Sequence, residues 1–251
     1  MIQLKDFLNY SNNVLEIERF QDYCPNGLQV EGKTEIKKII SGVTASQALI
    51  DAAISEKADV LLVHHGYFWK GEEAQITGIK YKRIRSLIES GINLVAYHLP
   101  LDAHPLYGNN AKLAEILDLD IAGSFPPGNT SVGMYGSLKT AMSATDFGQK
   151  VTTALGREVL HIGENSEQIQ TIAWCSGAAQ NYIEEAAGLG VDAYLTGEIS
   201  EPTVHIAREY GLHFYSAGHH ATERYGVQAF AEHLASHFGL THKFIDIPNP
   251  V

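Results

Sequence analysis

Three short stretches of the sequence gather histidine and carboxylate side chains. They are His64 with His65, His98 with Asp102, and His219 with His220 and Glu223. Imidazole and carboxylate together are common ligands of first-row divalent ions such as zinc, iron, nickel and manganese. No cysteine lies among them, which argues against a structural zinc clip built from thiolates. We therefore take these stretches as candidates for a catalytic metal site.

The number of candidate ligands indicates more than one ion. A single catalytic zinc ion commonly takes three ligands from the protein. Two ions about 3.5–4 Å apart, bridged by a carboxylate and a water, would use five. His219 and Glu223 are four residues apart at the start of a predicted helix, so they can meet on one face. Side chains of neighbouring strand residues point to opposite faces, so His64 and His65 would reach different ions from a strand end at Gly66.

A purely structural role for these side chains, such as capping helices, stays open, because short histidine patterns also arise by chance. The metal site is favoured because three separate stretches carry the same types of ligand side chain. The other histidines show no pattern of partners, and we interpret them as surface or core residues. Two of them share one helix face and are interpreted as solvated. The set is His104, His161, His205, His213, His233, His237 and His242, of which His233 and His237 share the helix face.

The three candidate stretches follow predicted strands in a chain where strand and helix patterns alternate. The first half carries strand patterns at 37–43, 58–63 and 92–97 and helix patterns at 46–57 and 79–90. This alternation predicts βαβ units and a mostly parallel sheet. Ligands bind beyond the carboxyl ends of strands in open α/β sheets. The candidate residues should therefore converge.

The second half of the sequence resembles the first. QTIAWCSGAAQ resembles KKIISGVTASQ and VDAYLTGEIS resembles ADVLLVHHGY, both about 133 positions apart, while GLHFYSAGHHATE resembles GINLVAYHLPLD about 120 positions apart. Three similar segments in the same order indicate a duplication. We expect two related α/β lobes with mostly parallel or mixed sheets and the metal site between them. Their expected bounds are 1–125 and 126–251, joined within 122–133, and the last strand could return to either lobe.

Composition narrows the possible partners and location. The chain has 18 basic and 29 acidic residues and a formal charge of -11, which argues against extended nucleic-acid binding. A small nucleotide remains possible, since a bound metal can supply positive charge. Cys24 and Cys175 form no CxxC pair, which suits a reducing compartment. No signal-peptide pattern and no apolar run of membrane-spanning length is present, so we expect a cytoplasmic protein that binds no membrane.

Several motifs resemble those of a known family along essentially the whole chain. VHHGYFW, YHLPLD, LTGE, AGHHATERYG and CPNGLQVEG resemble the Nif-three-like family, often labelled GTP cyclohydrolase I type-two homologues, in its short two-lobed form. The resemblance implies two divalent ions per chain and a toroidal homohexamer. It prefers His219 over His220 and makes Glu223 the bridging ligand. The metal ligands it implies are His64, His65, Asp102, His219 and Glu223.

The leading hypothesis is a dinuclear metal-dependent hydrolase that acts on a nucleotide or related small molecule. The family label suggests cyclohydrolase-like chemistry, and a phosphoester substrate would suit the same site. His98 and Glu198 lie in family motifs and would support the ligands or shuttle protons. The alternative is a non-catalytic metal-binding assembly or scaffold protein. An aromatic loop at Tyr67, Phe68 and Trp69 could stack on a base or form a protein contact.

Overall fold

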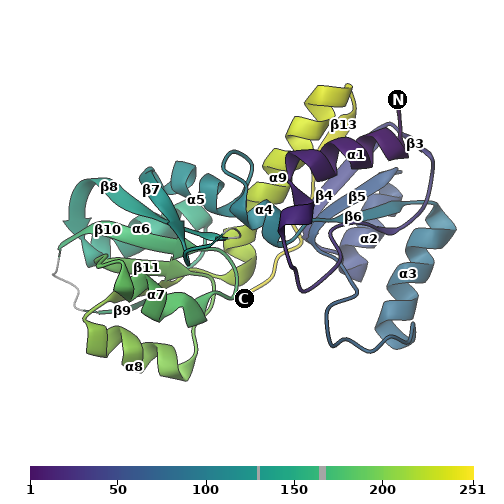
Figure 1. Ribbon diagram of the computed structural model, residues 1–251. Coiled ribbons are helices and arrows are strands. Elements are labelled where there is room, and N and C mark those ends of the chain that lie inside the picture. The colour runs from purple at the N-terminus through teal and green to yellow at the C-terminus, as the bar shows by residue number, and fades with distance from the viewer. Residues whose placement is uncertain (129–130, 164–167) are drawn as a thin grey trace. The chain divides into compact units, whose positions relative to one another are not determined.

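The computed structural model describes residues 1–128, 131–163 and 168–251 as a mixed α/β protein (Figure 1). Its contacts divide the chain into two compact units. One comprises Met1–Leu101 with Gly226–Ile247, and the other comprises Asp102–Tyr225 with Pro248–Val251. Helices α4 (Leu99–Ala103) and α9 (His219–Phe238) contribute residues to both units. The fold class is therefore the one expected, with two sheet groupings.

The first unit is built on a five-stranded sheet. The strand order is β13-β4-β5-β6-β2, with β2 antiparallel to β6 and the other neighbours parallel. The strands are β2 (Gly27–Val30), β4 (Lys38–Thr44), β5 (Val60–His65), β6 (Asn93–Ala96) and β13 (Thr241–Phe244). A separate antiparallel pair joins β1 (Ile2–Gln3) to β3 (Glu35–Ile36).

Helices cover both faces of this sheet, because its central strands are apolar on both sides. Figure 1 shows α2 and α3 on one face and α1 with the C-terminal part of α9 on the other. The bounds are α1 (Leu4–Val14), the 3₁₀ turn η1 (Ile17–Arg19), α2 (Gln47–Ser55) and α3 (Gly78–Ser90). The hydroxyl of Ser46 accepts the Leu49 N–H and so caps α2. On the α9 face, Phe230 is fully buried and meets the ring of Tyr97 edge-on at 5.8 Å.

The second unit is built on a six-stranded sheet with the order β7-β8-β10-β11-β12-β9. Strands β10, β11 and β12 are parallel, and the outer pairings are antiparallel. The strands are β7 (Leu119–Phe125), β8 (Gly133–Ser143), β9 (Leu160–Ile162), β10 (Gln168–Cys175), β11 (Ala193–Thr196) and β12 (His213–Ser216).

Helices α5 and α6 pack on one face of this second sheet, where Phe147, Trp174 and Tyr215 belong to the same buried cluster. Helices α7 and α8 lie on the other face (Figure 1). The bounds are α5 (Asn109–Leu117), α6 (Ala144–Leu155), the 3₁₀ turn η2 (Gln180–Tyr182), α7 (Ile183–Gly188) and α8 (Glu201–Tyr210). The hydroxyl of Ser143 accepts the Asp146 N–H and so caps the start of α6.

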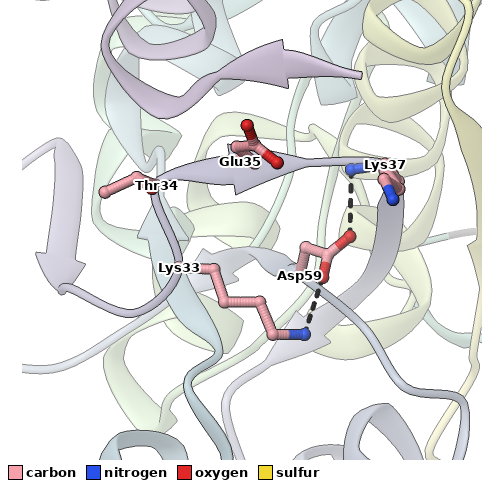
Figure 2. Close-up of a pocket in the computed structure, with 5 residues that line it drawn as sticks. All are labelled: Lys33, Thr34, Glu35, Lys37 and Asp59. Atoms are coloured by element: carbon pink, nitrogen blue, oxygen red, sulfur yellow. Dashed lines mark hydrogen bonds and ion pairs between the residues drawn. The ribbon is translucent and has the colours of Figure 1, made fainter.

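The two units share a plan that supports the duplication. Each has three consecutive parallel strands and an antiparallel strand on the outer edge of the third. Asp59 Oδ2 accepts the N–H groups of Lys37 and Lys38 at 2.9 and 3.1 Å. Asp192 Oδ2 likewise accepts the N–H groups of Gln170 and Thr171 at 2.9 and 2.8 Å, at the same offset of about 133 residues. Figure 2 shows Asp59 with Lys37 and with Lys33, whose Nζ lies 2.8 Å from its other carboxylate oxygen.

The division between the units differs from the expected boundary at residues 125 and 126. Residues 122–133 were expected to be a linker. In the described part of that range, the chain continues through β7 into the antiparallel β7–β8 pair, and residues 129 and 130 lie outside the described residues. Helix α5 packs against β7 and β8, so residues from Asp102 onward belong to the second unit. The last strand, β13, pairs in parallel with β4 of the first unit.

None of the helices in the described ranges combines the length and apolar character needed to cross a membrane.

Candidate functional site

In the first unit, His64 and His65 are the last two residues of β5, which therefore runs through both histidines and does not stop before them. His64 is fully buried, and its Nδ1 lies 2.9 Å from the carbonyl oxygen of Tyr97. A carbonyl can only accept, so Nδ1 carries the proton and Nε2 carries the lone pair that a metal requires. The two imidazole rings lie 4.6 Å apart between centroids.

Gly66 follows the histidine pair at a place where a side chain would not fit. A Cβ at this position would overlap the side-chain amide of Gln29 and crowd Ala96. Gln29 Oε1 accepts the N–H of Tyr67 at 2.7 Å. The contact of the Gln29 side chain with Gly66 and Tyr67 therefore holds the backbone in place directly after the two histidines.

His98 follows β6 and lies against the same histidines. Its ring centroid is 5.1 Å from that of His64 and 5.7 Å from that of His65. One ligand atom from each of the three residues lies within 4.8 Å of the others. Trp69 meets the His98 ring edge-on at 5.0 Å. The first unit thus gathers three imidazoles in one place.

Sequence reasoning missed Asp22, whose Oδ1 lies 2.7 Å from His98 Nδ1. The two residues are 76 positions apart, so no local periodicity could pair them. The available signal was the place of Asp22 just before the CPNG motif. Burial tends to raise the pKa of Asp22, but hydrogen bonds and the charge of His98 outweigh it and hold the pKa below its usual value. Asp22 is therefore a carboxylate at neutral pH.

Neither cysteine supplies a nucleophile or a ready thiolate ligand. Burial, together with the charge of Asp22, raises the pKa of Cys24 to about 12. Burial also raises the pKa of Cys175 well above its ordinary value. Both thiols are free, buried and protonated at neutral pH, which makes them poor nucleophiles.

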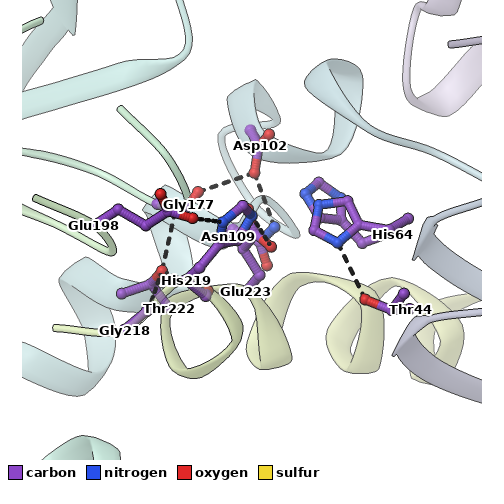
Figure 3. Close-up of polar contacts among 12 residues, drawn as sticks. Thr44, His64, Asp102, Asn109, Gly177, Glu198, Gly218, His219, Thr222 and Glu223 are labelled. Carbon is purple, nitrogen blue, oxygen red and sulfur yellow. Dashed lines mark hydrogen bonds and ion pairs between the residues drawn. The ribbon is translucent and has the colours of Figure 1, made fainter. Parts of the chain in front are cut away.

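In the second unit, His219 lies between two carboxylates at the start of α9. Its Nδ1 is 2.7 Å from Glu198 Oε1, and its Nε2 is 3.2 Å from Glu223 Oε2 (Figure 3). Burial by itself lowers the pKa of His219, but Glu223 and Glu198 outweigh it and raise the pKa to about 9. Glu198 follows β11 at the position that corresponds, at the offset of about 133 residues, to His65. This contact orients the His219 ring, and the supporting role of Glu198 at a metal site stays a prediction.

Asp102 is buried, and polar side chains of its own unit hold its Oδ1 atom. Asn109 Nδ2 and Ser176 Oγ each donate to this oxygen at 2.9 Å. Sequence reasoning missed both donors, because they come from α5 and from the turn after β10. Figure 3 shows Asp102 beside Asn109. These two bonds fix the orientation of the carboxylate.

Gly177, also missed, lies against the ligand pair of α9. Its φ is +69°, and a Cβ there would overlap the Glu223 carboxylate and crowd His219 Nε2. Glycine is therefore needed both for the backbone conformation and for the space. The neighbouring His220 uses its backbone N–H to donate to the Val251 carbonyl at 3.0 Å.

The remaining histidines do have partners, and two pairs of them lie close together in space. His237 stacks on Tyr10 at 3.9 Å between centroids, and the Tyr10 hydroxyl lies 2.8 Å from His233 Nε2. In the second unit, His161 Nε2 lies 3.1 Å from His213 Nδ1. The helix face that carries His233 and His237 thus contacts Tyr10 of α1, although His237 itself is exposed.

Comparison with known proteins shows the family of this chain. The family model described as Duf34/NIF3 (NGG1p interacting factor 3) matches residues 2–250. The chain belongs to the DUF34/NIF3 family. The family resemblance seen in the sequence motifs is thereby confirmed.

Relatives of this DUF34/NIF3 chain match it over nearly its full length. A Pseudomonas aeruginosa protein named GTP cyclohydrolase 1 type 2 homolog is 54% identical over 250 residues, covering 99% of each chain. The solved structure of protein ybgI, described as of unknown function, is 47% identical with a TM-score of 0.96 and covers 100% of both chains. The crystal structure of TTHA1606 from Thermus thermophilus is 33% identical with a TM-score of 0.89, again over 100% of both chains.

Proposed function

We propose that this DUF34/NIF3 protein is a divalent-metal-dependent hydrolase that acts on a nucleotide or a related small molecule. The observation that carries the proposal is His219, an imidazole oriented by one carboxylate, Glu198, and paired with a second, Glu223. A histidine that donates to a carboxylate through one nitrogen and offers the other is the usual arrangement of a metal ligand. The name of the Pseudomonas aeruginosa relative suggests a nucleotide as substrate.

The donor set fits first-row divalent ions. His64 donates through Nδ1 to a carbonyl, so its Nε2 is available as a ligand atom. Asp102 and Glu223 supply buried carboxylates. The proposed ligands of two ions, of zinc, iron, manganese or nickel, are His64, His65, Asp102, His219 and Glu223. When bound, such ions would supply Lewis acidity, which polarises a substrate and acidifies water.

The side chains of the first unit provide for proton transfer and for substrate contact. His98 is paired with the Asp22 carboxylate, as a general acid–base residue commonly is. Trp69 lies edge-on to His98 and is the best placed of the three loop aromatics to contact a substrate ring. Tyr67 does not serve this purpose, because it is buried and its hydroxyl donates to the Ala45 carbonyl at 2.6 Å.

Metal content per chain tests the proposal. Protein purified without a metal-affinity tag should hold close to two ions, and Asp102→Ala and His64→Ala should each reduce this number. Metal content must fall in both ligand variants. Glu201→Ala is the matched control, since Glu201 is an exposed partner of His205 on α8. Undiminished metal in either ligand variant, or no metal in the wild type, contradicts the ligand set.

Turnover separates the hydrolase from the alternative. The metal-loaded protein should hydrolyse GTP or bis(p-nitrophenyl) phosphate, and Glu223→Ala should abolish this activity. Two tightly bound ions without any turnover would favour a non-catalytic assembly or scaffold protein.

A further inference from the structure

Four N–H groups converge on the carboxylate of Asp22. Its Oδ1 lies 2.6 Å from the Tyr23 N–H nitrogen and 2.7 Å from His98 Nδ1. Its Oδ2 lies 2.9 Å from Asn26 Nδ2 and 2.9 Å from the Leu99 nitrogen. The side chain is only 3% exposed, so water does not compete for these bonds. Both oxygens are therefore occupied as acceptors.

The direction of three of these bonds is fixed independently of His98 protonation. The Tyr23 and Leu99 groups are backbone N–H donors and cannot reverse. The Asn26 amide is oriented by its own oxygen, which accepts the backbone N–H of His98 at 2.8 Å. Its NH₂ group therefore faces Asp22 as a donor.

The fourth bond then determines the tautomer of His98. A carboxylate oxygen only accepts, so His98 Nδ1 must carry a proton to make the bond at 2.7 Å. In the neutral ring, the lone pair is then on Nε2. A ligand atom of His98 lies within 4.8 Å of one from His64 and one from His65, which places the ring beside the proposed ligands.

We propose that Asp22 is a positioning residue that holds His98 in the Nδ1–H tautomer and so makes Nε2 the proton acceptor of the reaction. The role in catalysis rests on the proposed hydrolysis. As the oxygen of the attacking water bonds to the electrophilic carbon or phosphorus, its proton moves to His98 Nε2. When the bond to the leaving group breaks, Nε2 returns that proton to the leaving atom. Asp22 stays ionised throughout and stabilises the transient imidazolium.

Replacing Asp22 with asparagine should reverse the tautomer. The new NH₂ group cannot face the Leu99 and Asn26 donors without placing donor against donor twice. Turned the other way, it opposes only the Tyr23 N–H and can donate to His98 Nδ1. His98 then becomes an acceptor at Nδ1 and carries its proton on Nε2, where it blocks the base.

Nitrogen-15 solid-state NMR of histidine-labelled, zinc-loaded protein tests this directly, because the shifts of the two ring nitrogens identify the tautomer. The His98 signal is assigned as the one lost in His98→Gln. The wild type should show Nδ1–H, and Asp22→Asn should show Nε2–H. Nε2–H in the wild type, or Nδ1–H retained in a folded Asp22→Asn protein, overturns the proposal. Should Asp22→Asn fail to fold, the wild-type spectrum still decides the tautomer.

Kinetics with bis(p-nitrophenyl) phosphate test the catalytic part. Asp22→Asn should lower kcat by at least about 100-fold, with little change in KM and in metal content. Asp6→Asn, on an exposed position of α1, should leave kcat unchanged. A kcat that stays within about threefold of wild type in Asp22→Asn overturns the catalytic role. If the wild type shows no turnover at all, the proposed function and the catalytic role fail together, whereas the tautomer assignment stands or falls on the spectrum.

Discussion

Single residues orient the proposed ligands, and Glu198 is the clearest case. It accepts from His219 Nδ1 and leaves Nε2 for a metal. Glu198→Gln should weaken metal binding by about 10–100-fold, because the amide removes the negative charge behind the ring. Isothermal titration with Mn²⁺ measures the change. Glu201→Gln, at an exposed position nearby in the sequence, should bind as the wild type does. Equal affinities for all three proteins would contradict the role of Glu198.

The pKa of His219 predicts how metal binding depends on pH. A proton and a metal ion compete for its Nε2, and the pKa of about 9 means that the proton is held throughout the neutral range. Affinity should therefore rise with pH up to about 9, by about tenfold per pH unit for this one proton. Titration of Mn²⁺ at about pH 6.5, 7.5 and 8.5 checks the trend. Affinity that is constant over this range would show that His219 releases no proton on binding.

A substitution at Gly177 tests whether metal binding requires Glu223 in its observed position. Alanine at Gly177 would place a Cβ on the Glu223 carboxylate and would strain a φ of +69°. We expect Gly177→Ala to lower metal content per chain to about half or less of the wild-type value. Gly188→Ala is the matched control, because a Cβ there meets no atom within 4 Å. Full metal content in Gly177→Ala would show that Glu223 is not a ligand or can move freely.

At the scale of elements, one aspartate in each unit joins the starts of two neighbouring strands. Asp59 and Asp192 each precede the second parallel strand and accept two N–H groups from the first half of the first strand or the residue just before it. Asparagine can keep its one carbonyl oxygen toward those N–H groups, but it loses the negative charge that strengthens both bonds. Asp59→Asn and Asp192→Asn should each lower the free energy of unfolding by about 1–3 kcal/mol.

Urea denaturation followed by circular dichroism measures both variants. Asp51→Asn is the control, since Asp51 is exposed on α2 and its carboxylate accepts from the side chain of Gln47 on the same helix. If the free energy of unfolding falls in only one of the two variants, the duplicated contact stabilises only that unit.

The elements themselves were largely predictable from the sequence. Continuous apolar runs predicted β4 and β5, because both faces of these strands are buried, and period-3.6 apolar patterns predicted α2 and α3. The start of α6 was predictable from Ser143, whose hydroxyl caps the helix. The antiparallel β7–β8 pair was not, because the Pro- and Gly-rich sequence between the two strands has the composition of a linker.

At the scale of the whole molecule, we propose that the chain assembles into the toroidal hexamer implied by the family resemblance. Light scattering after size-exclusion chromatography should give six times the chain mass of 27.5 kDa. The chain has a formal charge of -11, so repulsion between copies weakens the assembly at low ionic strength. The measurement should therefore be made at about 0.15 M salt. A mass equal to one or two chains would exclude the hexamer.

The sequence by itself determined the family, the fold class and most of the elements, and it supplied the hypotheses of a duplication and of the candidate ligands. Motifs and apolar patterns of neighbouring residues indicate these properties. The tertiary structure decided which side chains support the candidates. Asp22 pairs with His98, Ser176 donates to Asp102, and Gly177 makes room for Glu223. Such contacts join residues about 46 to 76 positions apart, and hydrogen-bond geometry at that separation leaves no local pattern to read.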